Sequence, residues 1–325
     1  MKKTTMKFES KNAAKLHEGR KASYELIEKY HEKFIDPKTG LFEDKYLENR
    51  NCPVCDSNNF SKLFQCFGGI YVKCNGCTMI YTDPVFTQDA LNKYYFSLDT
   101  GQAAITDNES DFYREIYSKG LQSITKFITK GRMLDIGCSS GVFLDYAKDL
   151  GWSTCGIELG QAEGQIARSK GHIIYNSELE TIDFDEKFDV ITLWDVFEHI
   201  PNGKQYLSLI YELLSDEGVL FLQIPSSDSL AAKILREKCN AFDGLEHCNM
   251  YNPKTLKSVL EACNYEILQL NSVISEIAVM NNYFSYEDSY FGQTIYGENL
   301  LDCIDANFIH ENLLGYKLQC VVKKS

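Results

Sequence analysis

From Gly131 onward the sequence alternates apolar runs with amphipathic segments, and this alternation limits the fold more than any other feature. The runs with the composition of strands are 132–136, 153–158, 172–175, 188–194, 218–224 and 265–270. The segments with helical spacing between them are 141–150, 161–170, 203–214 and 253–263. A further apolar run, 315–323, suits a last, antiparallel strand. Repeated strand–helix units predict a mostly parallel sheet with helices on both faces.

A glycine-rich turn follows the first of these strands. The strand ends near Asp135, and Gly137 and Gly141 frame the turn that precedes the next helix. Glycine lets the backbone approach a ligand closely, but the third glycine of a pyrophosphate-binding loop is missing here. Glu158 ends the next strand, where its carboxylate can accept hydrogen bonds from both ribose hydroxyls. The turn therefore predicts a site for a nucleoside-bearing cofactor.

Two Cys-x-x-Cys pairs precede this region. They are Cys52 with Cys55 and Cys74 with Cys77, separated by residues 56–73. Four thiolates in two tight turns are the ligands of a closed tetrahedral zinc site, and the spacing is typical of one. Four ordinary cysteines would not explain both spacings, and a redox pair would not need a second pair. We therefore expect a structural Zn²⁺ site.

The charge of the chain bears on its partners. A net charge of −13 and a pI of about 5.0 disfavour a protein that binds the phosphate backbone of a nucleic acid. Residues 51–84 are neutral, with Lys62 and Lys73 against Asp56 and Asp83. The first residues have no apolar signal core, and no apolar run reaches the roughly 18 residues of a membrane-spanning helix. The sequence therefore predicts a cytoplasmic protein with no membrane contact.

Several motifs resemble a known family. Residues 134–144, LDIGCSSGVFL, look like the first motif of class I S-adenosylmethionine-dependent methyltransferases, and 156–158 look like their second. Residues 188–199 resemble the fourth-strand segment of ubiquinone-type and sugar-type members. Residues 214–220 are similar to the turn before the fifth strand, with an acidic pair in place of the usual Lys-Pro. Residues 71–84 resemble the zinc ribbon that precedes this domain in many bacterial methyltransferases, some of which act on nucleotide-linked deoxysugars.

This resemblance implies an α/β, Rossmann-like fold with a seven-stranded sheet that is parallel except for its last strand. It divides the chain into an N-terminal helical segment (1–50), a zinc ribbon (51–84), a helical linker or cover (85–130) and a methyltransferase domain (131–325). Within the last lies an aromatic-rich insert, 272–312. The insert is expected either to wall the acceptor pocket or to form extra core or a subunit interface.

The resemblance also assigns residues to the cofactor, S-adenosyl-L-methionine. The residues expected to contact it are Asp135, Gly137, Cys138, Ser139, Gly141, Glu158, Glu178 and Asp195. Asp135 and Gly137 would line the methionine end, and Glu158 would bind the ribose. Glu178 would lie near the adenine edge, unless it is an ordinary polar residue after the third strand. Asp195 would face both the cofactor and the acceptor.

Methyl transfer is an in-line displacement that needs an aligned nucleophile and, often, a base that removes its proton. Glu246 and His247 lie in the loop after the fifth strand and resemble a Glu-His pair of sugar methyltransferases, in which the histidine is proposed as the base. The alternative is a loop histidine bonded to backbone. His199, after Glu198, either packs beside the cofactor loop or takes part in metal binding or catalysis.

The sequence therefore predicts a zinc-containing, S-adenosylmethionine-dependent methyltransferase for a small-molecule acceptor, for example a nucleotide-linked sugar or a surface-polysaccharide precursor. One alternative is a zinc-ribbon methyltransferase of rRNA or tRNA, which the neutral ribbon disfavours. Another is a scaffold that binds the cofactor without turnover, which the intact cofactor loop disfavours. The acceptor, the methylated atom and the oligomeric state, including a homo-oligomer, stay open.

Overall fold

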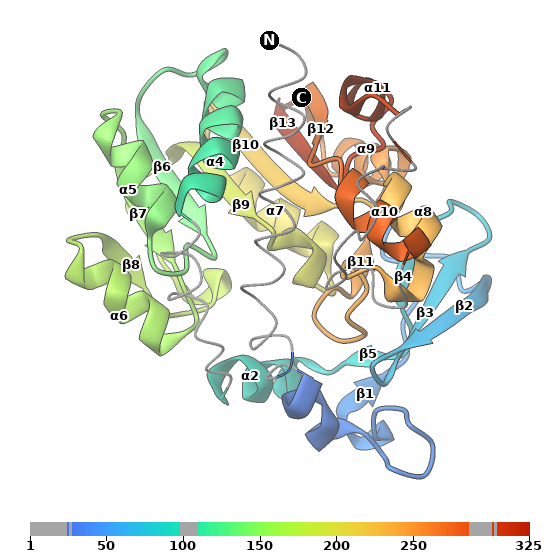
Figure 1. Ribbon diagram of the computed structural model, residues 1–325. Coiled ribbons are helices and arrows are strands. Elements are labelled where there is room, and N and C mark those ends of the chain that lie inside the picture. The colour runs from blue at the N-terminus through green and yellow to red at the C-terminus, as the bar shows by residue number, and fades with distance from the viewer. Residues whose placement is uncertain (1–24, 26–27, 98–109, 286–300, 302–303) are drawn as a thin grey trace.

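The computed structural model describes residue 25 and residues 28–97, 110–285, 301 and 304–325. Its centre is a seven-stranded sheet of order β12-β13-β10-β9-β6-β7-β8 (Figure 1). The strands are β6 (Arg132–Ile136), β7 (Ser153–Ile157), β8 (Ile173–Tyr175), β9 (Phe188–Trp194), β10 (Leu214–Pro225), β12 (Tyr265–Val273) and β13 (Lys317–Lys324). Strands β6 to β10 are parallel, and β13 runs antiparallel to β10 and β12. The predicted fold class is confirmed.

The helices between these strands are α5 (Val142–Asp149), α6 (Gln161–Ser169), α7 (Gly203–Leu213) and α9 (Pro253–Ala262). Their bounds lie within a residue or so of those predicted from helical spacing. Helix α9 begins at a capping box, in which the Asn252 side chain accepts a hydrogen bond from Thr255 N and the Thr255 hydroxyl accepts one from Asn252 N. Pro253 suits the first helical position because it has no N–H that needs an acceptor. Strand β10 begins earlier than predicted, at Leu214, because Leu214 pairs with Phe188 ahead of a break in register.

Alternation along the strands decides which helices cover each face of the sheet. Phe221 packs in the cluster that contains α5 and α4 (Ser110–Thr125). Its neighbours Leu220 and Leu222 point the other way, into the cluster of α7 and α9. Successive side chains of a strand face opposite sides, so a sheet covered on both faces needs continuous apolar runs. The strands at the centre have that composition.

The cysteine module, defined here as residues 51–84, forms a second sheet of order β11-β4-β3-β2. Its own strands are β2 (Phe60–Cys66), β3 (Gly69–Cys74) and β4 (Ile80–Thr82). The fourth, β11 (Asn249–Met250), comes from the long loop after β10. Val72, Met79 and Tyr81 of the module pack in the same buried cluster as the main sheet. The module is thus joined to the α/β fold through backbone pairing and a shared core.

The expected N-terminal helix lies largely outside the described residues. The described part has short 3₁₀ turns at Glu32–Phe34 and Asp44–Tyr46, and β1 (Leu47–Glu48) pairs with β5 (Val85–Phe86). Phe34, Phe42, Phe86 and Tyr94 form an aromatic cluster that also buries Leu245 of the loop after β10. The N-terminal segment therefore supports that same loop from another side.

The segment 85–130 supplies α2 (Gln88–Ser97) and α4, and α4 packs in the cluster on one face of the sheet. Of the aromatic-rich insert, the structure describes α10 (Ile277–Ser285) and α11 (Ala306–Glu311), and α10 contacts α8 (Leu230–Leu235). The sequence pattern did not indicate these short helices. Among the described helices, none combines the length and the apolar character that crossing a membrane requires.

Substituting Gly69 tests the contact between the module and the loop. A Cβ at Gly69 would lie 2.0 Å from Gly244 O, a backbone atom that cannot rotate away. We expect Gly69→Ala to destabilise the protein by about 1–3 kcal/mol, as overpacking does, in thermal or urea unfolding. Gly76→Ala is the matched control, because its Cβ would meet only Cys74 Sγ at 3.7 Å and Cys55 Sγ at 3.9 Å. Equal stability of both variants would contradict the close approach.

Candidate functional site

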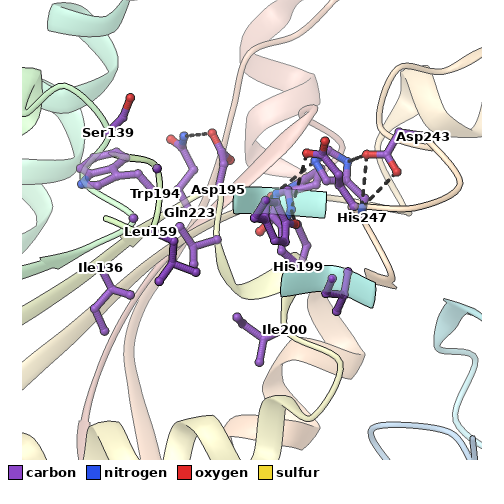
Figure 2. Close-up of a pocket in the computed structure, with 18 of the residues that line it drawn as sticks. Ile136, Ser139, Leu159, Trp194, Asp195, His199, Ile200, Gln223, Asp243 and His247 are labelled. Carbon is purple, nitrogen blue, oxygen red and sulfur yellow. Dashed lines mark hydrogen bonds and ion pairs between the residues drawn. The ribbon is translucent and has the colours of Figure 1, made fainter. Parts of the chain in front are cut away.

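A cavity of about 1200 Å³ opens at the carboxyl ends of the parallel strands, where α/β enzymes bind their ligands (Figure 2). Much of its lining comes from the loops that follow β6, β7, β8, β9 and β10, and α2, α4, the N-terminal segment, the residues just after β12 and the start of β13 contribute further residues. The predicted residues that line it are Asp135, Gly137, Cys138, Ser139, Glu158, Glu178, Asp195, Glu246 and His247. The sheet topology therefore brings together both predicted halves of the site, the cofactor residues and the Glu-His pair.

Two glycines shape the turn after β6. Gly137 has a φ of 76°, and a Cβ there would lie 2.5 Å from Val196 Cγ2. Gly141 has a φ of 79° and precedes α5, but it does not line the cavity. A Cβ at Gly141 would meet His172 and Ala167 instead, so this glycine lets α5 lie close to α6. Gly137 thus shapes the cavity wall, and Gly141 shapes the packing behind it.

The Glu158 carboxylate links the turn after β6 to the loop in which Glu158 itself lies. Its Oε2 accepts a bond of 2.8 Å from Ser139 N, and its Oε1 accepts one of 2.7 Å from Gly160 N. Burial raises the pKa of this carboxyl above its usual 4.5, although the backbone donors oppose that effect. An ionised carboxylate has about four acceptor positions. Two acceptor positions therefore remain for the donors of a ligand.

Asp135 is almost fully buried at the end of β6. The register of β6 and β9 places it opposite Thr192, whose hydroxyl donates to Asp135 Oδ1 at 2.7 Å. Burial raises the pKa of Asp135 to about 8, despite that hydrogen bond. A positive charge alongside favours the ionised form of such a carboxyl. A ligand with an ammonium group would supply such a charge.

Glu178 and Cys138 complete this half of the cavity. Glu178 precedes the 3₁₀ turn Leu179–Thr181 after β8, and its buried Oε1 has no hydrogen-bond partner among the described residues. Buried polar atoms without a partner are rare, so this oxygen fits a ligand donor such as an adenine amino group. Cys138 packs its sulfur against β7, where a Cβ at Gly156 would lie 2.5 Å from it. The Cys138 thiol thus touches strand backbone as well as lining the cavity.

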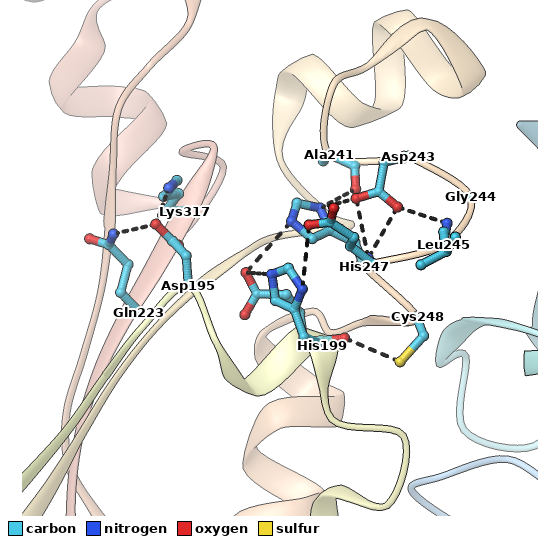
Figure 3. A network of polar contacts seen from close by, with 12 residues as sticks. Asp195, His199, Gln223, Ala241, Asp243, Gly244, Leu245, His247, Cys248 and Lys317 are labelled. Carbon is cyan, nitrogen blue, oxygen red and sulfur yellow. Dashed lines mark hydrogen bonds and ion pairs between the residues drawn. The ribbon is translucent and has the colours of Figure 1, made fainter. Parts of the chain in front are cut away.

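Asp195 lies directly after β9, between the two halves of the cavity (Figure 2). Its Oδ2 accepts hydrogen bonds from Gln223 Nε2 at 3.0 Å and from the Lys317 ammonium (Figure 3). Lys317 reaches this edge because antiparallel β13 begins opposite Pro225, where parallel β10 ends. The sequence pattern did not single out Lys317 or Gln223, because nothing near them in the chain signals a site.

The second half of the cavity contains two histidine rings from different loops. His199 lies in the 3₁₀ turn Phe197–His199 after β9, and His247 lies in the loop after β10. Their ring centroids are 4.9 Å apart and the rings are nearly perpendicular (Figure 3). Glu198 Oε1 is 3.9 Å from the Nε2 atom of both. Tyr95, which the sequence did not indicate, places its hydroxyl 3.0 Å from His199 Nδ1.

The environment gives the two histidines opposite protonation tendencies. Burial, with the nearby His247 charge, lowers the pKa of His199 to about 3. Burial also acts to lower the pKa of His247, but the carboxylates of Asp243 and Glu198 outweigh it and raise that pKa above 6.5. Glu198 is fully buried, and burial together with Asp195 raises its pKa to about 8. Of this pair, His247 is thus the ring that takes up a proton more readily.

Hydrogen bonds fix the tautomer of His247. Its Nδ1 lies 2.9 Å from Ala241 O, a carbonyl that can only accept, so Nδ1 carries the hydrogen. Its backbone N–H donates to Asp243 Oδ1 at 3.1 Å. In the neutral ring Nε2 then has a free lone pair toward Glu198. The two roles predicted for His247, a base and a histidine bonded to backbone, are therefore compatible. Nδ1 donates to the backbone, and Nε2 can accept a proton.

Glu246 belongs to the same group of side chains. It accepts a hydrogen bond from the Tyr94 hydroxyl, and its Oε2 is 3.9 Å from His199 Nδ1. Burial, followed by the charge of Asp243, raises the pKa of Glu246 to about 7. Glu246 therefore lies beside the rings as a carboxyl group that can hold or release a proton.

The four cysteines of the two pairs lie together in the module. Cys52 Sγ is 3.5 Å from Cys77 Sγ, Cys55 Sγ is 3.5 Å from Cys74 Sγ, and all four sulfurs fall within 4.8 Å of one another. Zn–S bonds of about 2.3 Å in a tetrahedron place the sulfurs about 3.8 Å apart. The set fits a structural zinc ion, and none of the four cysteines lines the cavity.

A second group of ligand atoms lies in the cavity itself. Glu198, His199 and His247 each offer one within 4.8 Å of the others. A carboxylate and two imidazoles at this spacing can share protons or hold a divalent cation. The fully buried Glu198 carboxylate has no hydrogen-bond donor within the part of the chain that the structure describes. Its charge must therefore be balanced by a proton, an imidazolium or a ligand.

Replacing one module cysteine tests the zinc site. We expect wild-type protein to carry about one zinc per chain, and Cys55→Ser to lose most of it, because one ligand of four is removed. Elemental analysis of the purified proteins measures this. The control is Cys263→Ser, since Cys263 lies in the α9–β12 turn and outside the sulfur cluster. Zinc contents that are equal in the wild type and both variants would rule the site out.

Glu158→Gln tests the cofactor half. The glutamine amide would place an NH₂ group against the N–H donors of Ser139 or Gly160 and would remove the charge expected to hold the ribose of the cofactor. We expect S-adenosylhomocysteine to bind at least about tenfold more weakly, since bonds to a charged group contribute about 1.5–3 kcal/mol. Isothermal titration measures the affinity. Glu217→Gln, at an exposed position outside the cavity, should bind as the wild type does.

Comparison with known proteins finds similarity in the α/β part of the chain. A family model described as a methyltransferase domain matches residues 110–270. The ubiquinone biosynthesis O-methyltransferase of Pasteurella multocida is 31% identical over 111 residues, which are 29% of this chain and 46% of that protein. An uncharacterized protein of Methanocaldococcus jannaschii is 24% identical over 160 residues, or 49% of this chain and 76% of its own length. The chain spans less than half of the ubiquinone O-methyltransferase it matches.

Solved structures show likeness at low sequence identity. The plantazolicin methyltransferase BpumL, in complex with a desmethyl analogue and SAH, has a TM-score of 0.49 and 18% identity, covering 72% of this chain and 95% of that one. Magnesium protoporphyrin IX methyltransferase from Synechocystis, with bound SAH, has a TM-score of 0.49 and 12% identity, covering 74% and 100%. The matched family model covers the parallel strands β6 to β10 and the helices between them. Residues 110–270 thus match a methyltransferase domain, and the strand order of the sheet agrees with the predicted α/β fold.

Proposed function

We propose that this chain transfers the methyl group of S-adenosylmethionine to a small-molecule acceptor, with His247 as the base. The observation that carries the proposal is a single cavity lined at one side by Asp135 and Glu158 and at the other by Glu246 and His247. A cofactor bound in the first half would point its reactive end toward Asp195 and the histidines. The acceptor would then occupy the second half.

The cofactor half binds and orients. Glu158 holds the ribose hydroxyls, the unpartnered Oε1 of Glu178 takes an amino hydrogen of adenine, and Asp135 faces the amino group of the methionine end. When bound, S-adenosylmethionine supplies an electrophilic methyl group on a sulfonium. As the nucleophile bonds to that carbon, the C–S bond breaks and its electron pair stays on sulfur. Alignment of these atoms is the main contribution of the protein to the displacement.

The histidine half removes the proton. His247 donates from Nδ1 to Ala241 O, so its Nε2 is free to accept a proton from the acceptor as the new bond forms. The imidazolium that results lies beside Glu198 Oε1 and near the Asp243 carboxylate, and both stabilise it. His199, held by Tyr95, stays neutral and does not compete for the proton. The proton can later leave to solvent or to Glu246.

The acceptor class follows from the lining of this half. Glu198, Asp243 and Glu246 face it, and the described lysines that line the cavity are Lys238 and Lys317, the second paired with Asp195. Polar side chains and one base suit an acceptor with hydroxyl groups. A nucleotide-linked sugar remains a candidate, and its diphosphate would have to bind near Lys238. The name of the Pasteurella multocida relative, an O-methyltransferase, supports oxygen as the methylated atom.

Two alternatives compete with this function. A methyltransferase of rRNA or tRNA would need cations to meet phosphates, whereas the charged side chains of the lining are mostly acidic and the module is neutral. A scaffold that binds the cofactor without turnover would not need a buried carboxylate between two histidine rings. Release of S-adenosylhomocysteine in the presence of a small acceptor would exclude both.

His247→Asn tests the assignment of the base. Purified protein is screened for S-adenosylhomocysteine release with nucleotide sugars and with uncharged hydroxylated compounds. With an acceptor from that screen, we expect His247→Asn to lower kcat by about 10²–10⁴-fold, as loss of a general base does, with cofactor affinity unchanged. His310→Asn, on α11 and outside the cavity lining, should keep wild-type activity.

The pH profile of the wild type gives a second measurement. The base works when neutral, and Asp243, Glu198 and Glu246 raise the pKa of His247 above 6.5 against the effect of burial. The rate should therefore rise with pH through a midpoint above 6.5. This limb should vanish in His247→Asn. A limb that persists unchanged in the variant would assign the base elsewhere.

A further inference from the structure

Arg50, just before the cysteine module, joins three segments that are far apart in the sequence. Its guanidinium donates from Nε to Thr82 O at 2.9 Å, from Nη1 to Pro201 O at 3.1 Å and from Nη2 to Cys248 O at 2.7 Å. All three acceptors are backbone carbonyls. A planar guanidinium holds its donors in a fixed fork, so it sets the relative positions of the three backbones rather than only their charge.

Two of these carbonyls flank the residues of the histidine half. Pro201 follows the turn that carries His199, and Cys248 is the residue after His247. The two loops also contact each other, since Cys248 Sγ donates to Glu198 O at 3.4 Å. Arg50 therefore connects the module to both loops at the point where they meet.

Tyr71 makes a second connection from the centre of the module. It lies in β3, its side chain is fully buried, and its hydroxyl donates to His247 O at 3.0 Å. The same hydroxyl accepts a hydrogen bond of 3.3 Å from Gly244 N. Just beyond, β11 pairs with β4 through Asn249 and Tyr81. The loop from Gly244 to Asn249 is thus held on the module by consecutive backbone contacts.

The cofactor half is held differently. Glu158 is oriented by Ser139 N and Gly160 N, and Asp135 by the Thr192 hydroxyl. These partners belong to the main sheet and its loops, and none belongs to residues 51–84. A change in the module should therefore move the acceptor half of the cavity while the cofactor half stays in place.

We propose that Arg50 and Tyr71 are positioning residues through which the cysteine module sets the geometry of His199 and His247. Neither residue lines the cavity, and both contact the backbones of the loops that carry the histidines. The expected effect on turnover rests on the proposed function. The restraint of the two loops by Arg50 and Tyr71 can be measured without an acceptor.

Hydrogen–deuterium exchange of the full chain is the test. In Arg50→Lys a single ammonium replaces the fork, so we expect amides in 195–203 and 241–252 to exchange at least about tenfold faster, because the backbone bonds that restrain both loops are lost. Amides in 132–141 and 153–160 should stay within twofold of the wild type, and so should the dissociation constant of S-adenosylhomocysteine. Exchange that rises equally in all four segments would mean a global loss of stability and would overturn the proposal.

Two further variants keep the test interpretable. Tyr71→Phe removes only the hydroxyl, and it should speed exchange in 241–252 while leaving 195–203 unchanged, since Tyr71 contacts the second loop alone of the two. Arg236→Lys is the matched control, because Arg236 is exposed and lies outside these contacts. No change of exchange in either loop of Arg50→Lys and Tyr71→Phe would refute the positioning role.

Turnover separates this proposal from the proposed function. With an acceptor from the screen, Arg50→Lys should lower kcat at least about tenfold with the KM for S-adenosylmethionine unchanged. An equal loss through that KM would contradict the proposal. If the wild type methylates no acceptor although it binds S-adenosylhomocysteine, the proposed function fails, whereas the exchange experiment still decides the role of Arg50 and Tyr71.

Discussion

The backbone contact between the cysteine module and the loop after β10 is the constraint on which the site depends. A parallel sheet leaves long connections at its carboxyl edge, and the one after β10 runs far before α9 begins. Pairing of β11 with β4 and the close approach of Gly69 to Gly244 fix that connection. A loop carrying a base needs such support, because a displacement of about 1 Å can cost orders of magnitude in rate. The module therefore supports the loop that carries the proposed base.

Burial has different consequences in the two halves of the cavity. In the cofactor half it raises the pKa of Asp135 and Glu158, whose ionised forms a cofactor with an ammonium and hydroxyl groups would favour. In the histidine half it lowers the pKa of His199, while neighbouring carboxylates keep His247 easily protonated. In the proposed function, one half thus binds by completing hydrogen bonds and charge pairs. The other holds a proton acceptor in a defined tautomer.

Local pattern was sufficient for the main sheet and for the cofactor turn. Strand β6 and strand β9 have the predicted bounds, because continuous apolar runs report burial on both faces. Residues such as Glu158 and Asp195 could be placed because they directly follow strands. Lys317, Tyr95 and Arg50 could not, since their partners lie far away in the chain. Short helices such as α8 were missed because a few residues carry little periodicity.

The sequence by itself determined the α/β class, the order of strands and helices along the chain, and the two Cys-x-x-Cys turns of the module. Spacing and apolar periodicity act over a few residues, so these features are local. Only the tertiary structure decided that His199 and His247 meet at Glu198, and that Asp195 pairs with Lys317. Those contacts depend on the antiparallel insertion of β13 and on the docking of the module, which bring distant segments to one edge of the sheet.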